Sequence, residues 1–253
     1  MVYSAMVLKL LLLFCAGLFA GFCNIMAGGG SLLTLPALIF LGLPASVANG
    51  TNRVAILVQN IFATARFRQG GHFYWKAGLI LTIPAVIGAS LGSLLAVRIP
   101  DELFKKILAG VMVASLATVL MNKSRTLEKI QDVKIKHFLP LILTFFFVGI
   151  YGGVIQAGVG FLVILTLSLV PHISLVQLNS LKIFIILIYM IPSLLIFMVH
   201  GKVDWIYGLI LAAGNGLGGW LGAHVAIKKG DRIIKIVFSA AVFVMALRLL
   251  GLI

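Results

Sequence analysis

The chain has 253 residues, of which 62% are hydrophobic and only 10% are charged. A soluble globular domain carries roughly 45–50% apolar and about 25% charged residues. A water-soluble fold of this length could not bury so much apolar surface, whereas a helical bundle in lipid need not bury it. The composition therefore excludes an ordinary soluble enzyme and predicts an all-α protein that crosses a bilayer several times.

The charge balance is strongly basic, with 20 Lys and Arg residues against 6 Asp and Glu residues and a formal net charge of +14. Two causes remain open, namely basic cytoplasmic loops beside anionic lipid or an electropositive route for an anionic solute. Nucleic-acid binding is not expected, because the basic residues lie in short connections and no long soluble tail carries them.

Apolar segments follow one another along the chain in two sets of five, as expected for helices that cross a membrane. The first set comprises residues 6–26, 31–43, 46–67, 76–97 and 103–121. The second set comprises residues 138–156, 161–170, 175–199, 205–227 and 233–252. The sequence thus predicts a first transmembrane repeat over 1–121, a basic cytoplasmic linker over 122–137 and a second transmembrane repeat over 138–253.

The two sets are related by a shift of 130 residues, which places Asn49 on Asn179 and Trp75 on Trp205 without a gap. The same shift pairs Gly28 with Gly158, Gly30 with Gly160, Gly88 with Gly218, Gly92 with Gly222, Asp101 with Asp231 and Lys105 with Lys235. Matching Trp, Asn and Asp residues do not follow from an apolar composition. We therefore interpret the chain as an internal duplication.

The basic connections predict that the two repeats are inverted. Basic residues gather between the third and fourth segments of the first set, in the linker, and between the last two segments of the chain. These three connections can all be cytoplasmic only if the halves face opposite ways across the membrane. The expected fold is an all-α polytopic protein of two inverted five-segment repeats in the cytoplasmic membrane.

The second segment of each set is too short to cross a bilayer. Residues 31–43 and 161–170 would form helices of about 20 and 15 Å, against a hydrocarbon core of about 30 Å. We expect broken or re-entrant helices here. Because irregular backbone at membrane depth is tolerated only where protein or water covers it, these breaks should line a cavity.

Glycine-rich stretches at the starts of both short segments are the first candidates for a binding site. They contain Gly28, Gly29, Gly30 and Ser31 in the first half, and Gly158 and Gly160 in the second. Glycine lets a ligand approach the backbone, and a helix N-terminus offers unpaired N–H groups and partial positive charge to an anion. The alternative is that these glycines serve close helix packing.

Polar residues at the starts of the two third segments are the second group of candidates. They are Asn49, Thr51, Asn52 and Arg53 in the first half, and Asn179 and Lys182 in the second. Such residues are costly in lipid unless they face a polar interior, where they could bind the same anion. The alternative is that each segment begins at the membrane interface, with the Asn as helix cap and the cation reaching to water.

Several chemistries are not expected from this sequence. The six carboxylates all fall in connections or at segment edges, so coupling to protons through an Asp or Glu within the membrane is disfavoured. No metalloprotease, nucleophile-elbow or phosphate-loop motif occurs, and the two cysteines have no ligand set around them. We predict no enzyme activity, no cofactor and no metal site.

At its glycine and asparagine stretches the chain resembles the sulfite exporter TauE/SafE family of membrane transporters, which includes 4-toluene sulfonate uptake permease-like proteins. The resemblance rests on Gly28-Gly29-Gly30-Ser31, Pro36, Leu41-Gly42-Leu43-Pro44, Ala48-Asn49-Gly50-Thr51-Asn52, Gly158-Val159-Gly160 and Asn179-Ser180-Leu181-Lys182. It implies transport of sulfite, sulfonates or related organosulfur anions, often outward.

The resemblance also implies which residues lie near the transported anion. On one side these are Gly28, Gly29, Gly30, Asn49, Thr51 and Asn52, and on the other Gly158, Gly160, Asn179 and Lys182. Many relatives have Ser or Thr where this chain has Asn52 and Arg53. This departure leaves the identity of the anion open, and Arg53 would favour a more highly charged one.

We therefore predict a secondary carrier for a small anion, working by alternating access as the inverted repeats rock around the two glycine breaks. A passive anion channel and a non-transporting membrane scaffold are the alternatives. The expected partners are a small anionic substrate and membrane lipids. The sequence leaves open the direction of transport, the coupling ion and whether the chain forms a homodimer.

Overall fold

The fold was analysed in a computed structural model, which describes residues 2–71, 75–121, 138–167, 175–226 and 243. In these ranges the chain forms nine α-helices and no strand. They are α1 (Val2–Ala27), α2 (Ser31–Phe40), α3 (Ala45–Gln69), α4 (Trp75–Ala96), α5 (Asp101–Met121), α6 (Phe138–Val154), α7 (Val159–Leu167), α8 (Leu175–Val199) and α9 (Trp205–Ala226). They match the first nine predicted segments, which confirms the all-α prediction. The linker and all of the tenth segment except Phe243 lie outside the described residues.

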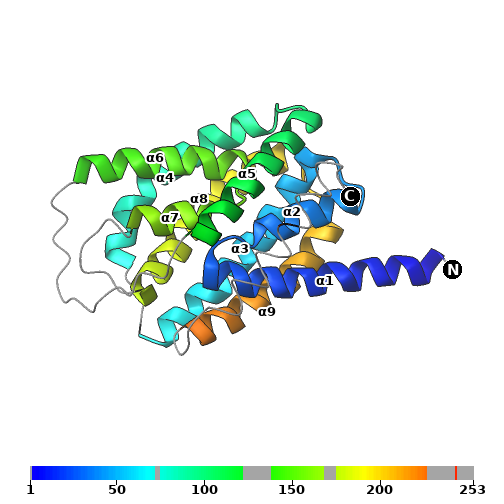
Figure 1. The fold of residues 1–253 in the computed structure, drawn as a ribbon, viewed down its shortest axis with the longest axis horizontal. Coiled ribbons are helices and arrows are strands. Elements are labelled where there is room, and N and C mark those ends of the chain that lie inside the picture. The colour runs from blue at the N-terminus through cyan, green and yellow to red at the C-terminus, as the bar shows by residue number, and fades with distance from the viewer. Residues whose placement is uncertain (1, 72–74, 122–137, 168–174, 227–242, 244–253) are drawn as a thin grey trace.

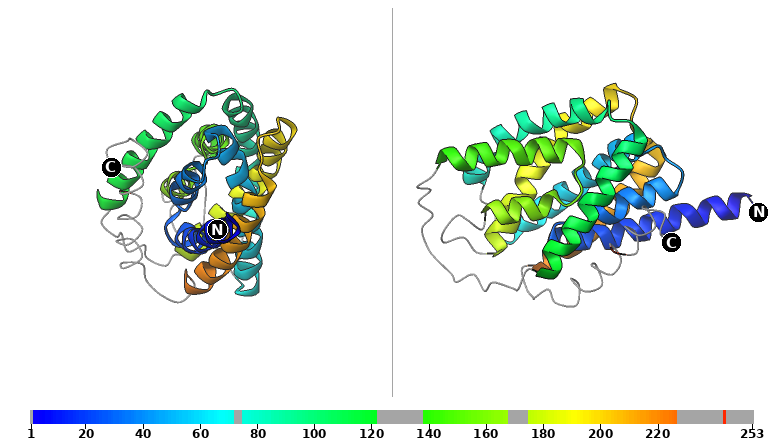
Figure 2. Two further views of the ribbon diagram at one scale, coloured as in Figure 1. Left: turned by 90° about the vertical axis from the view of Figure 1, so that its right-hand side faces the viewer. Right: turned by 45° about the horizontal axis from the view of Figure 1, so that its top comes forward.

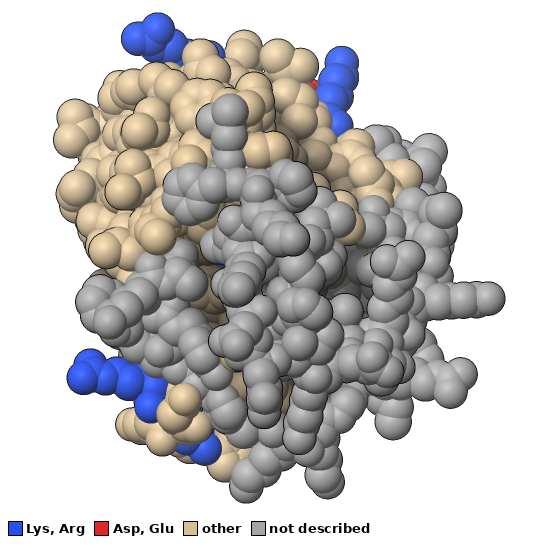
Figure 3. All heavy atoms as spheres, turned by 90° about the vertical axis from the view of Figure 1, so that its left-hand side faces the viewer, with Lys and Arg blue, Asp and Glu red and all other residues tan. Residues whose placement is uncertain are grey.

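The surface of the bundle is suited to lipid. Within the described ranges, three helical stretches are long and apolar enough to cross a membrane, namely Met6–Met26, Gly78–Ala96 and Val176–Val199. Large apolar side chains such as Ile83 and Leu195 are exposed on them. In Figure 3, the Lys and Arg side chains gather at the upper and lower margins of the described surface. Exposed apolar surface of this extent is stable against hydrocarbon rather than water, so the chain is a membrane protein.

The two short helices follow sharp breaks in the chain. Helix α2 has 10 residues and α7 has 9, which gives about 15 and 14 Å of helix. Gly28 (φ +94°) and Gly158 (φ +72°) occupy the left-handed region that glycine tolerates best. Helix α7 begins two residues earlier than predicted, so Gly160 lies in its first turn. Both helices are too short to cross a bilayer, and a re-entrant path for them stays a prediction.

The most extensive helix packing joins the first half of the chain to the second. Helix α1 packs along α9 and α6 along α4, while α3 packs on α9 and α8 on α4. Figure 1 shows the α1–α9 and α4–α6 pairs on opposite sides of the molecule, and Figure 2 shows α5 across from α4, α8 and α9. The shift of 130 residues relates the α1–α9 pair to the α6–α4 pair, and the α3–α9 pair to the α8–α4 pair. The core is therefore shared between the halves.

Glycines allow the close approach of these paired helices. A Cβ atom on Gly218 of α9 would overlap the carbonyl oxygen of Leu18 in α1, and one on Gly88 of α4 would overlap that of Phe146 in α6. Gly88 and Gly218 are equivalent under the shift. In membranes such small residues let helix backbones come into contact, which supplies much of the packing energy between helices.

Replacing Gly218 by alanine is expected to destabilise the protein because the new methyl group must push α9 away from α1. Overpacking of this kind costs about 1–3 kcal/mol, or roughly 2–4 °C of unfolding temperature per kcal/mol in a protein of this size. Gly110→Ala in α5 is the matched control, since a Cβ there meets nothing within 4 Å. Thermal unfolding in detergent measures both variants, and equal midpoints for the two would contradict this packing.

Polar contacts distinguish the two ends of the long helix α3. At its start, Asp101 accepts a hydrogen bond from the second residue of the helix, and the N–H of Asp204 donates to the Thr51 hydroxyl at 2.9 Å. At its end, Arg66 lies 2.8 Å from a ring nitrogen of His224 in the last turn of α9. The α4–α5 and α8–α9 connections therefore lie at the start of α3, and the C-terminal end of α9 lies at its end.

Candidate functional site

The two glycine breaks lie against each other. A Cβ atom on Gly28 would come within 2.8 Å of the carbonyl carbon of Gly160, and one on Gly160 would overlap the carbonyl oxygen of Gly28. No side chain fits between them, so the two backbones are in direct contact. The structure thus places the connection between α1 and α2 directly against the first turn of α7.

Asn24, in the last turn of α1, fixes the start of α2. Its side-chain oxygen accepts a hydrogen bond of 3.1 Å from the N–H of Gly30, so this N–H group is already taken. Ser31, at the first position of α2, is 3% exposed. The sequence pattern did not mark Asn24, although an isolated amide at the end of an apolar run is a signal that could have found it.

Two tyrosines fix the second break. Gln156 has a positive φ of 65°, and its side-chain oxygen accepts a hydrogen bond of 3.0 Å from the Tyr189 hydroxyl. The Tyr151 hydroxyl donates to the carbonyl oxygen of Ala157 at 2.5 Å. A non-glycine residue in this backbone region is strained, and the tyrosines hold it in place.

Arg53 is fully buried and binds the C-terminal end of α6. Its guanidinium donates to the carbonyl oxygens of Gly152 and Gly153 at 3.3 and 2.5 Å, and to the Ser193 hydroxyl at 2.6 Å. The carbon of the guanidinium lies 4.4 Å from the ring centre of Phe197, in a cation–π contact. The alternative in which this cation reaches to water is wrong, because the side chain is 0% exposed.

Asn49 also binds the C-terminal end of α6. Its amide nitrogen donates to the carbonyl oxygen of Val154 at 2.8 Å, and its oxygen accepts from Arg53 at 3.4 Å. Because α3 begins at Ala45, after Pro44, Asn49 is not a helix cap and that alternative is also wrong. The last carbonyl groups of a helix lack partners within the helix, and Asn49 and Arg53 supply them for α6.

Lys182 makes the equivalent contact in the other direction. It is 2% exposed, so it does not reach to water either, and its ammonium group donates to the carbonyl oxygens of Asn24 and Ile25 at 3.2 and 3.1 Å. These carbonyls lie in the last turn of α1. Each long helix, α3 and α8, therefore sends a cation to the C-terminal end of the first helix of the opposite half, where the helix dipole is negative.

The remaining predicted residues differ in their surroundings. Asn52 accepts a hydrogen bond of 2.6 Å from Thr34 of α2, while its amide nitrogen is buried and has no partner among the described residues. The side-chain oxygen of Asn179 is likewise buried without a partner there. Thr51 binds the α8–α9 connection through Asp204. Asn52 is thus the predicted side chain next to α2 that keeps an unused donor.

The interior around the breaks is electropositive. Arg53 and Lys182 are buried, whereas none of the described Asp and Glu residues is. No group of three residues suited to holding a metal ion occurs in the described ranges. A buried cation is costly unless opposite charge compensates it, and the carbonyl ends of α1 and α6 supply only partial charges. The described interior around the breaks therefore carries a net positive charge.

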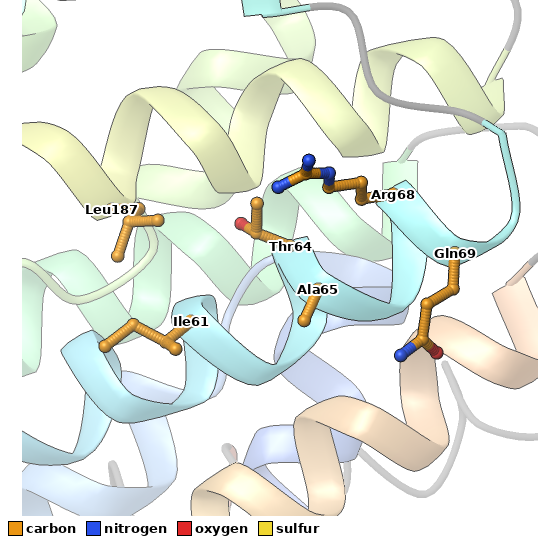
Figure 4. A pocket seen from close by; sticks show the side chains of 6 residues that line it. All are labelled: Ile61, Thr64, Ala65, Arg68, Gln69 and Leu187. Carbon is orange, nitrogen blue, oxygen red and sulfur yellow. The ribbon is translucent and has the colours of Figure 1, made fainter.

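A cavity of about 570 Å³ lies in a different place, along α3 and α8 (Figure 4). Its lining residues are Ile61, Thr64, Ala65, Arg68, Gln69 and Leu187. None of these belongs to the predicted binding set. The expectation of a hollow beside the breaks is therefore not met by this cavity, and the contact between Gly28 and Gly160 closes the space between the two backbones.

Comparison with known proteins gives a match along nearly the whole chain. The family model described as "Sulfite exporter TauE/SafE" matches residues 13–249. A "Probable membrane transporter protein ORF9" of Sinorhizobium sp is 29% identical over 94% of this chain and 91% of its own length. A "Probable membrane transporter protein" of Haemophilus influenzae is 27% identical over 89% and 88%, and the "Probable membrane transporter protein YfcA" of Escherichia coli K12 is 26% identical over 94% and 88%. No solved structure matches the chain.

Proposed function

Because this chain belongs to the sulfite exporter TauE/SafE family of membrane transporters, we propose that it exports a small sulfur oxyanion, such as sulfite or a sulfonate. It is a multi-pass protein of the cytoplasmic membrane and acts as a secondary carrier. Relatives named as probable membrane transporters support transport as such. The choice of an anion rests on the geometry of the two breaks.

The observation that carries this proposal is that, of the two helix ends at each break, only the negative one is bound by a buried cation. The negative ends, at the end of α1 and of α6, are bound by Lys182 and Arg53. The positive end of α7 carries Gly160, which contacts Gly28, three residues before the positive end of α2. With the negative ends compensated, the net field in the break is positive. An anion is the ligand that such paired N-termini bind best.

The residues of the site then divide into two roles. Backbone N–H groups around the glycines, with the Ser31 hydroxyl and the Asn52 amide, contact the anion. Arg53, Asn49 and Lys182 are positioning residues, because each donates to helix-end carbonyls. Of the Arg53 nitrogens, Nε is the one without a partner among the described residues. They also supply the positive potential that draws an anion into the membrane. This division refines the expectation that both cations touch the substrate directly.

Inverted repeats are the proposed basis of alternating access. The α3–α4 connection begins at the end of α3, whereas its equivalent under the shift, the α8–α9 connection, lies at the start of α3 through Asp204 and Thr51. Equivalent connections at opposite ends of one long helix support opposite orientations of the two halves. Rocking of the halves would then part the Gly28–Gly160 contact and open the site.

The same contact favours a carrier over a passive channel, since a channel requires a continuous water-filled path. In the closed conformation the two breaks touch, and the anion can be exchanged only after they separate. A carrier that works this way has a limited turnover rate. Its flux therefore saturates with substrate concentration, whereas flux through an open pore does not.

Reconstitution into liposomes tests the proposal. Flux of sulfite, thiosulfate, sulfate and simple sulfonates is measured with and without a pH gradient. We expect saturable flux of at least one sulfur oxyanion, and acceleration by the same anion on the opposite side. Flux that rises linearly with concentration would support the channel instead. Equal rates in empty and protein-containing vesicles for every anion would rule out transport and favour a scaffold.

A further inference from the structure

The cavity along α3 and α8, here called the α3–α8 groove, is separate from the glycine breaks. It is lined by Ile61, Thr64, Ala65, Arg68, Gln69 and Leu187. Its volume of about 570 Å³ is much larger than a small oxyanion needs. Ile61 is 50% exposed, so the groove opens onto the outer, apolar surface of the bundle. A ligand of this groove would therefore be reached from the lipid.

The groove has one polar end and one apolar end. Figure 4 shows the guanidinium of Arg68 on the same side of α3 as Thr64, beneath α8, while Ile61 and Leu187 lie further along. The Thr64 hydroxyl oxygen is buried and has no hydrogen-bond partner among the described residues. Arg68 is exposed and forms no ion pair there. A hydroxyl and a guanidinium with unused donors lie one helical turn apart.

The equivalent surface in the second half lacks this polar end. Under the shift of 130 residues, Thr64, Arg68 and Gln69 correspond to Leu194, Met198 and Val199 of α8. Met198 is 38% exposed and Val199 is 84% exposed, as expected of side chains that face lipid tails, whereas Leu194 is 7% exposed. The outer end of this surface, at Met198 and Val199, is therefore exposed as Arg68 and Gln69 are. Only the α3 copy adds groups that can bind a phosphate.

The position of the polar end indicates which lipid it meets. The end of α3 carries Arg66, Arg68 and the contact to His224, and basic helix ends face the cytoplasm. The cytoplasmic leaflet is the one rich in anionic headgroups. A guanidinium pairs with phosphate through two parallel hydrogen bonds, and the neighbouring hydroxyl adds another donor.

We propose that the α3–α8 groove binds one anionic phospholipid of the cytoplasmic leaflet. Its phosphate accepts hydrogen bonds from Arg68 and Thr64, and one acyl chain lies along Ile61 and Leu187. This site does not depend on the identity of the transported anion. The lipid would contact both of the long central helices, α3 and α8.

Native mass spectrometry of the full chain in detergent tests this proposal, with phosphatidylglycerol and phosphatidylcholine added in equal amounts. The wild type is expected to retain phosphatidylglycerol preferentially. The preference should fall about tenfold in Arg68→Gln and severalfold in Thr64→Val, as expected for lost hydrogen bonds to a charged group. Arg98→Gln is the matched control, because Arg98 is also exposed but lies at the α4–α5 connection, outside the groove.

Thermal unfolding of the same variants provides the second measurement. Without lipid, Arg68→Gln and Arg98→Gln should unfold at the wild-type temperature, since both side chains are exposed. Phosphatidylglycerol should then raise the midpoint of the wild type and of Arg98→Gln, but not of Arg68→Gln. Equal lipid preference in Arg68→Gln and Arg98→Gln would overturn the proposal. So would inorganic phosphate that stabilises the wild type as strongly as the lipid does.

Discussion

Replacing Arg53 by methionine is expected to lower the free energy of unfolding by on the order of 3 kcal/mol. The change leaves the carbonyl oxygen of Gly152 buried without a donor and that of Gly153 with only the Ser93 hydroxyl, and each unsatisfied buried group costs about 1–3 kcal/mol. It also removes the cation–π contact with Phe197. Unfolding in detergent by heat or denaturant measures the loss. Arg98→Met, at an exposed position, should leave stability unchanged.

Arg53→Lys separates a positioning role from direct contact with the substrate. Lysine keeps the charge and can still donate to the end of α6, but it cannot reproduce the forked guanidinium geometry. We expect slower transport with an unchanged ratio of sulfite to sulfate rates. If Arg53 held the anion itself, this ratio would change, because the geometry of anion binding would change. Wild-type stability in Arg53→Met would contradict the contacts described for this residue.

Gly160→Ala is expected to reduce the rate of anion transport by at least about tenfold, with a smaller effect on stability of about 1–3 kcal/mol. The new methyl group would overlap the carbonyl oxygen of Gly28, so the two breaks could no longer close against each other. Gly160 is the better choice for this test than Gly28, whose positive φ would add backbone strain.

The matched control for Gly160→Ala is Gly110→Ala, where the added methyl group meets nothing within 4 Å. Initial rates of flux in liposomes and unfolding temperatures are measured for both variants. A Gly160→Ala protein that unfolds slightly earlier but transports at the wild-type rate would show that the contact between the breaks is not part of the transport cycle.

The helices and the two breaks could be predicted from the sequence because each has a local signal. Long apolar runs gave the long helices, and short runs preceded by glycine gave α2 and α7. The start of α7 was misplaced by two residues, since Val159 is apolar and β-branched and its helical conformation depends on the preceding turn. That turn includes Gln156 with a positive φ, a conformation that no local pattern predicts for glutamine.

The partners of the polar side chains could not be predicted, because most are backbone carbonyls far away in the chain. Arg53 binds Gly153, which is 100 residues further on, and Lys182 binds Ile25, which is 157 residues before it. A carbonyl group is present at every residue, so the sequence carries no mark of which ones are left free. Only the tertiary fold, which brings the Arg53 side chain to the end of α6 and the Lys182 side chain to the end of α1, selects them.

Two interpretations of Asn49 and Arg53 were open for a related reason. A polar residue near the start of a helix can cap it or can face the interior, and composition does not distinguish the two. The position of the helix start decides the matter. Helix α3 begins at Ala45, four residues before Asn49, so the amide points sideways from the helix toward α6 instead of capping it.

Locating a bound anion by the anomalous X-ray scattering of selenite, the selenium analogue of sulfite, tests most directly where the substrate binds. We predict a selenium peak whose oxygens lie about 3 Å from backbone N–H groups of Gly28, Gly29, Ser31, Gly158 or Gly160, with Arg53 and Lys182 still on the ends of α6 and α1. A peak on the guanidinium of Arg53 or on the ammonium group of Lys182, in place of the helix-end carbonyls, would contradict this account.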